Sequence, residues 1–156
     1  VVVRGTVEAG APLTGLLRDT PGVYRRMVFA AGKTWVHEAA VDFALIDDRG
    51  HRILIQAGGA RWLAPGRELM TYPAVRFTRA DVPDPVRRLV AATGQPTIEA
   101  SERVLTPGTQ VQVVGYKTAS ADATGEAAGY RLPPQRATLR SGPEVPLVIT
   151  SLEDLR

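Results

Sequence analysis

The residues best suited to binding a metal ion are two histidines, His37 and His51. Four carboxylates lie near them in the sequence: Glu38, Asp42, Asp47 and Asp48. Imidazole nitrogens and carboxylate oxygens can together hold Zn²⁺. We expect His51 to lie opposite Asp47 across a turn, ten residues from His37 along an extended strand, so at ~3.3 Å per residue the two histidines are roughly 30 Å apart. The sequence therefore predicts no metal site.

The sequence offers no arrangement typical of an active site. Asp47 and Asp48 could form an acid–base pair, but aspartate is also favoured at the start of a tight turn. The motifs Gly-x-Ser-x-Gly, Gly-x-x-x-x-Gly-Lys-Ser/Thr and Gly-x-Gly-x-x-Gly are absent, and so is cysteine. We therefore predict a protein that is not an enzyme, with no catalytic residues and no cofactor.

Nucleic-acid binding has one candidate constellation, formed by Tyr24, Arg26 and Trp35. OB-folds stack bases on aromatic side chains and follow the phosphates with arginine. The alternative is that the aromatic residues fill a barrel core while the arginines face solvent. The formal net charge is only +3, and the excess lies in residues 1–78. Nucleic-acid binding therefore stays the less favoured alternative.

Composition is that of one soluble globular domain. The chain has 156 residues, of which 44% are hydrophobic and 22% charged. No apolar run approaches the ~20 residues that a membrane-spanning helix needs. Because the chain opens on Val1–Val3 in the middle of an expected strand and without methionine, we expect a single domain over residues 1–156, excised from a longer protein.

Period-two alternation and turn residues predict an all-β chain. The expected strands are Val1–Glu8, Val23–Phe29, Thr97–Leu105, Gln110–Tyr116, Gln135–Leu139 and Pro146–Thr150, with a short apolar element over Glu68–Tyr72. Pro107-Gly108 marks a tight turn before the valine-rich strand. The span 118–134, rich in Ala, Gly, Thr, Asp and Pro, is expected to be a flexible hairpin loop.

A long hairpin is expected over Thr34–Ala57, with its turn at Asp47–Gly50. A three-residue loop with Gly50 in the left-handed conformation pairs Leu45 with Ile53, Phe43 with Ile55 and Val41 with Ala57. A two-residue loop would instead mix apolar and polar side chains on one face. We therefore predict the loop with a glycine bulge.

One helix is expected, over residues 84–93. Asp84 is the expected N-cap, Pro85 occupies the first helical position, and Gly94 follows the last turn. Val86, Leu89 and Val90 would form its apolar stripe.

Several segments, in this order, resemble the GIDE family, also called the "beside a membrane" (BAM) domain. They are Val3-Arg4-Gly5-Thr6-Val7; Pro12-Leu13-Thr14-Gly15 with Val23-Tyr24-Arg25-Arg26 and Trp35; Phe43 through Gly50; Glu102 through Pro107-Gly108 to Gly115; and Pro146 through Ser151. The resemblance covers nearly the whole chain. Such domains occur in mitochondrial ubiquitin ligases and in bacterial membrane proteins.

The resemblance implies an OB-like, partly open barrel that serves protein interaction rather than catalysis. In the ligases a separate cysteine-rich RING domain performs the ubiquitin chemistry, and this chain has no cysteine. It therefore implies a membrane-associated location through segments outside this chain, a protein partner and no ligase activity. It supplies no catalytic residue to carry over.

Overall fold

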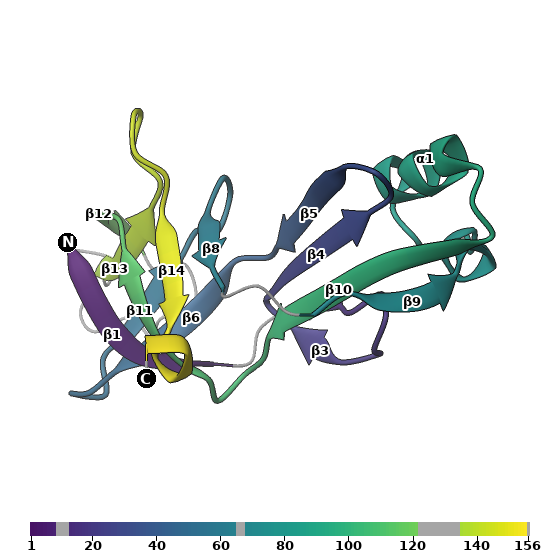
Figure 1. Cartoon of the computed structure of the whole chain (residues 1–156). Helices are drawn as coiled ribbons and strands as arrows, with labels where there is room; N and C mark the ends of the chain where they lie inside the picture. The colour runs from purple at the N-terminus through teal and green to yellow at the C-terminus, as the bar shows by residue number, and fades with distance from the viewer. Residues whose placement is uncertain (9–12, 65–67, 122–134, 156) are drawn as a thin grey trace.

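In the computed structural model the chain is predominantly β, with 51% of its residues in strands and one short α-helix. The structure describes residues 1–8, 13–64, 68–121 and 135–155. Two sheets stand side by side and form two lobes joined near the middle of the molecule (Figure 1). Within the described residues the strands form no closed barrel. The high strand content confirms the predicted all-β class.

The large sheet has eight strands in the order β12-β13-β7-β6-β1-β11-β14-β8. Their bounds are β1 Val2–Val7, β6 Phe43–Asp47, β7 Arg52–Ile55, β8 Arg61–Leu63, β11 Gln110–Val114, β12 Tyr116–Ala121, β13 Gln135–Arg140 and β14 Val148–Ser151. Alternation sets its inner face: Val111 and Val113 are buried, whereas Gln112 between them is partly exposed. Inward side chains from all of these strands except β12 form one hydrophobic cluster.

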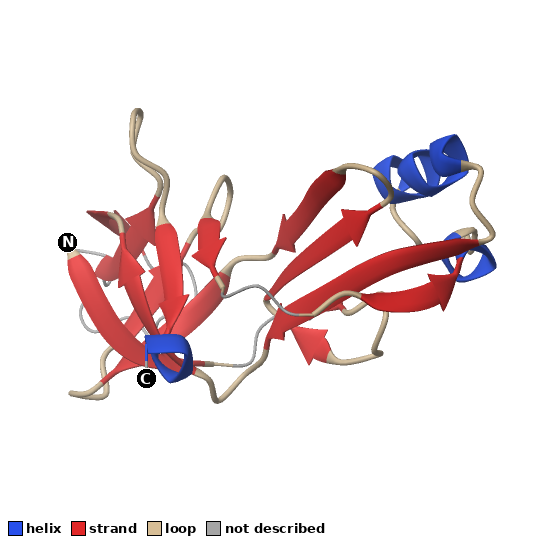
Figure 2. Cartoon of the chain, viewed as in Figure 1, coloured by secondary structure: helices blue, strands red, loops and turns tan. Residues whose placement is uncertain are grey.

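The small sheet has four strands in the order β5-β4-β10-β9. Their bounds are β4 Tyr24–Ala30, β5 Thr34–Ala40, β9 Met70–Pro73 and β10 Thr97–Leu105. One face, here called the covered face, carries Met27 and Phe29 and packs against the helical segments. These segments are the 3₁₀ helix η1, Ala74–Phe77, and α1, Asp84–Thr93, and Figure 2 shows both at the outer end of this lobe.

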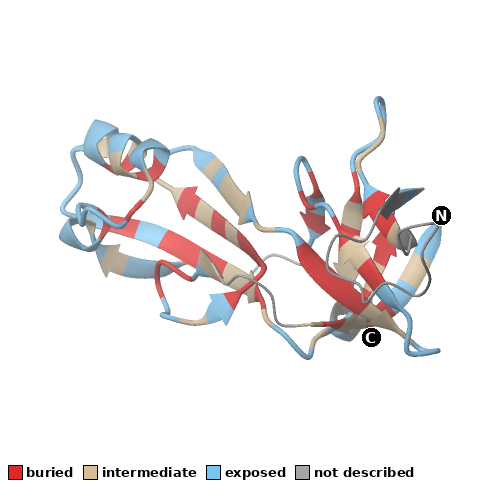
Figure 3. Cartoon of the chain, turned by 180° about the vertical axis from the view of Figure 1, so that it is seen from behind, coloured by how far each residue is buried: buried red, intermediate tan, exposed pale blue. Residues whose placement is uncertain are grey.

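The opposite face of the small sheet, here called the open face, carries Arg26, Val28, Val36 and Glu38, which are exposed or only partly buried. The remaining elements are a two-stranded ribbon, β2 Leu13–Thr14 with β3 Pro21–Gly22, and the 3₁₀ helix η2, Leu152–Leu155. Buried residues occur in both lobes and at their junction (Figure 3). Tyr24 and Leu105, at the inner end of the small sheet, belong to the cluster of the large sheet.

The turn predicted at Asp47–Gly50 is confirmed. Phe43 pairs with Ile55 and Leu45 with Ile53, while Gly50 has φ +80°. Asp47, at the start of the turn, donates its backbone N–H to the carbonyl of His51 at 3.0 Å. This is the pairing that keeps apolar side chains on one face.

The prediction of one long hairpin over Thr34–Ala57 is wrong for the residues before Phe43. The chain leaves the small sheet at Ala40 and enters the large sheet at Phe43, so β5 and β6 belong to different sheets. Between them the Asp42 carboxylate accepts the backbone N–H of Ala57 at 2.9 Å. A polar side chain thus holds the crossing point where a continued strand would place Val41 against Ala57.

The helix covers the predicted residues 84–93, and Val86 and Val90 are buried. The cap assignment needs a correction, because Pro83 is the N-cap and Asp84 already lies within the first turn. Gly94 ends the helix with φ +61°, as predicted. Of the span 118–134, residues up to Ala121 pair with β13 in a hairpin, and residues 122–134 lie outside the described part.

Candidate interaction site

Tyr24, the first member of the predicted nucleic-acid constellation, is buried at the junction of the lobes. It is 1% exposed, and its hydroxyl donates to the carbonyl of Ala60 at 2.9 Å. Its ring meets Trp62 edge to face, with centroids 5.7 Å apart. Burial, followed by the nearby Glu38 charge, raises the pKa of Tyr24 to about 12. Tyr24 therefore joins the two lobes and presents no ring to solvent.

Arg26 lies on the open face, where it contacts an acidic neighbour. Its Nε is 3.6 Å from a carboxylate oxygen of Glu38 on β5. The other oxygen of Glu38 is 3.3 Å from Nη1 of Arg61, at the start of β8. Glu38 is therefore shared by two arginines from different lobes.

Trp35 lies on the covered face, because it is the cross-strand partner of the buried Phe29. Tyr24 and Arg26 belong to the other register of β4, whose side chains point to the opposite side. The structure thus brings Tyr24 and Arg26 to one side of the sheet and places Trp35 on the other. A single strand of nucleic acid following one face would meet only part of this set.

The most accessible feature of the small sheet is the outer edge of β5. Val41 donates its N–H to the carbonyl of Val23, and Ala31 donates to Lys33. Because backbone direction alternates along a strand, every second residue from Lys33 to Val41 bonds to β4. The N–H and C=O groups of Thr34, Val36, Glu38 and Ala40 therefore point outward, and within the described chain no strand pairs with them.

Other sheet edges are shorter or protected, whereas β5 is neither. The edge strand β8 has three residues, β9 has four and ends in Pro73, which has no N–H to offer, and β12 has six and contains Lys117. Between Thr34 and Ala40 the chain has no proline, lysine or glycine, and its one carboxylate, Glu38, is paired with Arg26 and Arg61. Val36, at the middle of the edge, is 50% exposed. β5 is thus a seven-residue edge that can receive another strand.

Cavities lie at both ends of β5. One, of about 680 Å³, is lined by Lys33, Trp35, Leu89 and Ala92 among others, between the β4–β5 turn and α1. The other, of about 320 Å³, is lined by Glu38, Ala39, Ala40 and residues 57–61 at the junction of the lobes. Figure 1 shows α1 near one end of β5 and β8 near the other. The outward edge thus runs between two hollows.

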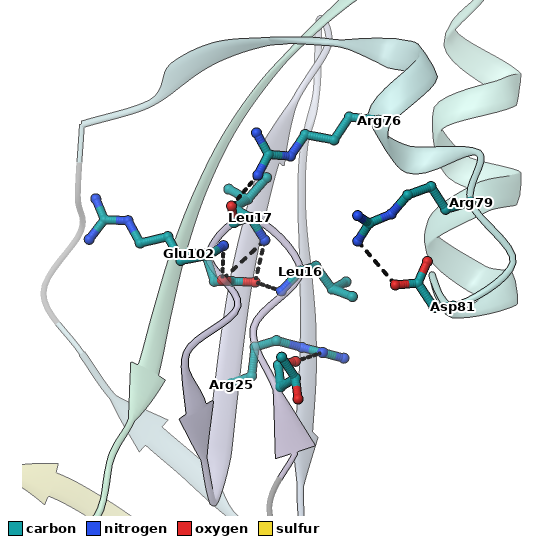
Figure 4. A network of polar contacts seen from close by, with 9 residues as sticks. Leu16, Leu17, Arg25, Arg76, Arg79, Asp81 and Glu102 are labelled. Carbon is teal, nitrogen blue, oxygen red and sulfur yellow. Dashed lines mark hydrogen bonds and ion pairs between the residues drawn. The ribbon is translucent and has the colours of Figure 1, made fainter.

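On β10, two strands away from this edge, a buried carboxylate holds the covered face (Figure 4). Glu102 on β10 accepts the backbone N–H groups of Leu16 at 2.6 Å, Leu17 at 3.2 Å and Arg18 at 3.4 Å. Arg76 donates from η1 to the carbonyl of Leu17. These contacts fix the segment between β2 and β3 against the sheet.

Arg25 is buried beside this carboxylate on the covered face. It is 6% exposed, and its Nη1 donates to the carbonyl of Thr14 at 2.6 Å. Burial lowers the pKa of Arg25, and the charge of Glu102 opposes that shift. The two residues are therefore opposite charges that share one desolvated environment.

The two histidines lie in different surroundings. His51 is exposed and its Nδ1 lies 3.1 Å from the Asp47 carboxylate. His37 lies on the covered face of β5 and has a buried Nε2 with no hydrogen-bond partner in the described part of the chain. Burial and the Arg25 charge lower the pKa of His37, while Glu38 raises it. Among the residues that the structure covers, no group of three His, Asp or Glu side chains could hold a metal ion.

Comparison with known proteins gave no match to a family model, to a curated protein or to a solved structure. No helix in the described ranges is long and apolar enough to cross a membrane.

Sequence reasoning did not find the β5 edge, although part of it is visible in the sequence. A run of seven residues without proline, lysine or glycine can be read from Thr34–Ala40. What the sequence does not reveal is that the strand ends at the edge of its sheet.

Proposed function

We propose that this chain is a non-catalytic protein-interaction module of a membrane-anchored bacterial protein. The observation that carries the interaction role is the outward backbone of β5. Unpaired N–H and C=O groups in a row can add a strand from another chain, which gives affinity through main-chain hydrogen bonds. The membrane anchor rests on the resemblance to GIDE domains and would lie outside this sequence.

An OB-like arrangement of the large sheet belongs to the same proposal. What supports it is that the large sheet encloses one hydrophobic cluster on its inner face and that β1 pairs antiparallel on both sides, with β6 and β11. An experimental structure tests it: a sheet that stays open and flat would contradict the OB-like assignment.

The interaction role is tested by capturing partners from the membrane fraction of the source organism with three forms of the protein. Val36→Pro removes one outward N–H, and because that group does not bond to β4 the sheet should persist. Val36→Ala shortens the side chain and leaves the backbone intact, so it is the matched control. We expect a protein retained by the wild type and Val36→Ala but lost by Val36→Pro. Failure of the wild type to retain any protein would count against the interaction role.

The membrane assignment has a separate test, which is the parent open reading frame. Hydrophobic helices encoded beside this region would support it, and their absence would remove it. Neither result bears on the β5 edge.

Single-stranded nucleic acid remains the alternative ligand and is tested directly. We expect no binding of a labelled oligonucleotide at ~50 mM salt, because phosphate contacts need concentrated positive charge. Arg26→Ala is the informative variant, since Arg26 is accessible on the open face. Tight, salt-sensitive binding that Arg26→Ala weakens would favour the alternative.

A further inference from the structure

The chemistry around β5 restricts what can pair with it. A strand added along Thr34–Ala40 spans roughly 20 Å at ~3.3 Å per residue and meets the two cavities at its ends. Its side chains next to Trp35, His37 and Ala39 would lie on the covered face, and those next to the intervening residues on the open face. An alternating pattern is therefore required of the partner.

Basic groups outnumber acidic ones along this edge. Arg26 and Arg61 share the single carboxylate of Glu38, and Lys33 lines the cavity at the opposite end. Together with Asp42, which follows β5 and accepts the N–H of Ala57, the local balance is three positive charges against two negative. Acidic residues at both ends of an added strand would complement it.

The cavity beside Trp35 favours an apolar side chain. Leu89 and Ala92 of α1 contribute to its wall together with the Trp35 ring, while Lys33 stands at its rim. In an antiparallel strand, which pairs slightly more stably than a parallel one, the residue next to Trp35 lies near the C-terminal end of the partner. That residue is the one placed to enter the cavity.

A second copy of this chain fits the edge poorly. Antiparallel self-pairing over the whole of β5 puts Thr34 of one copy opposite Ala40 of the other. The β4–β5 turn and α1 of one copy would then lie beside residues 57–61 of the other, where the junction already lines a cavity. Lys33 would also approach Arg61. A single extended segment avoids both conflicts.

We infer that β5 binds an extended segment of another protein as an added antiparallel strand, with acidic residues at its ends and a large apolar residue in the cavity beside Trp35. This inference rests on the proposed interaction role and names the chemistry of its partner. Main-chain hydrogen bonds would supply affinity, and the cavity and the charges would supply specificity.

A synthetic peptide serves as the probe. Acetyl-Glu-Val-Thr-Val-Thr-Leu-Glu-amide matches Ala40 to Thr34 in antiparallel order, with leucine opposite Trp35 and the valines on the covered face. Replacing both glutamates by lysine tests the charge, and replacing leucine by alanine tests the cavity. Binding of fluorescein-labelled peptides is measured by fluorescence anisotropy at low salt.

We expect the lysine peptide to bind at least about tenfold more weakly than the glutamate peptide. Val36→Pro should weaken binding of the glutamate peptide about tenfold, whereas Val36→Ala should change it less than about threefold. Equal affinity of wild type and Val36→Pro would overturn the site. Equal affinity of the two charge forms would overturn the acidic partner.

The cavity is tested on α1, where two neighbouring exposed alanines provide a matched pair. Ala92 lines the cavity and Ala91 does not. Ala92→Gln should reduce binding of the leucine peptide toward that of the alanine peptide, and Ala91→Gln should leave the difference between the peptides intact. If both variants still bind the leucine peptide more tightly than the alanine peptide, the leucine does not enter the cavity.

Two further results separate this inference from its rivals. The chain has no cysteine, so His37→Cys reports self-pairing without background, because residue 37 would face its own copy across a non-hydrogen-bonded pair about 4.5 Å apart. Spontaneous disulfide dimers of His37→Cys would overturn the foreign partner in favour of a second copy. A native partner that depends on the β5 backbone, combined with peptides that show no charge preference, would leave the interaction role standing and remove this inference.

Discussion

Replacing Glu102 by glutamine is expected to destabilise the protein more than any other single-atom change on β10. The carboxylate is 8% exposed and accepts N–H groups from Leu16, Leu17 and Arg18. Glutamine keeps the volume but presents one oxygen and one NH₂ group to three donors. It also leaves the buried Arg25 guanidinium without its opposite charge.

The expected cost follows from these contacts. Hydrogen bonds to a charged group contribute about 1.5–3 kcal/mol each, and the buried Arg25 guanidinium also loses the charge that opposes its desolvation. These contributions overlap, and the remaining amide oxygen still accepts. We therefore expect Glu102→Gln to lower the free energy of unfolding by about 2–4 kcal/mol.

Urea unfolding at neutral pH measures this change. Tryptophan fluorescence reports on both lobes, because Trp35 packs against the hydrophobic cluster of the small sheet and Trp62 belongs to that of the large sheet. Glu99→Gln is the control: Glu99 is exposed on the same strand, so its change should stay within about 0.5 kcal/mol. If Glu102→Gln is as stable as Glu99→Gln, the carboxylate does not hold the segment between β2 and β3.

Three other substitutions test the junction, the edge and the close approach of β3 to β10. Tyr24→Phe should lower the free energy of unfolding in urea by about 1 kcal/mol, because the hydrogen bond to Ala60 is lost. The difference between the ultraviolet pH titrations of wild type and Tyr24→Phe should show a phenol that ionises near pH 12 rather than 10. A step near pH 10 would contradict the burial of Tyr24. The pKa of His37 is lowered in the folded state, so below the usual histidine value of about 6.5 the unfolded chain binds more protons than the folded one. The free energy of unfolding should therefore fall as the pH falls through that value, and His37→Gln should make this dependence on pH less steep. The same dependence in wild type and His37→Gln would exclude the effect. Gly22→Ala would bring a Cβ within 2.2 Å of a β10 side chain and 2.7 Å of a β10 carbonyl, so the thermal unfolding midpoint should drop by several degrees. Gly58 has open space around it, so Gly58→Ala should leave the midpoint unchanged. Similar midpoints for the two variants would refute the close contact.

Local chemistry predicted the local elements of this fold. The Asp47–Gly50 turn and its register follow from turn residues and alternation, and the helix over residues 84–93 follows from its proline and glycine boundaries. The break after Ala40 did not follow, because β5, Val41 and β6 read as one uninterrupted strand pattern. The bonds found at that point, Val41 to Val23 and Ala57 to Asp42, are tertiary contacts that the local sequence does not reveal.

The candidate site was predicted less well, for a physical reason. Tyr24 and Trp35 are both aromatic and near arginines, yet alternation on paired strands places them on opposite faces, and residue type alone cannot tell a buried junction from a stacking surface. Whether a strand lies at a sheet edge depends on every other strand, including the parallel pairs β13–β7 and β14–β8. Composition carries no trace of these long-range pairings.

All four strands of the small sheet lie within residues 24–105, whereas the large sheet takes strands from before, within and after that stretch. A chain emerging from the ribosome has all four strands of the small sheet once Leu105 is out. At that moment β1 can pair with β6 but lacks β11, whose partner residues lie more than a hundred positions away, as in Val3 with Val113. Contacts of such separation form slowly. The lobe that carries the open edge is therefore expected to be complete while the other still awaits its last four strands.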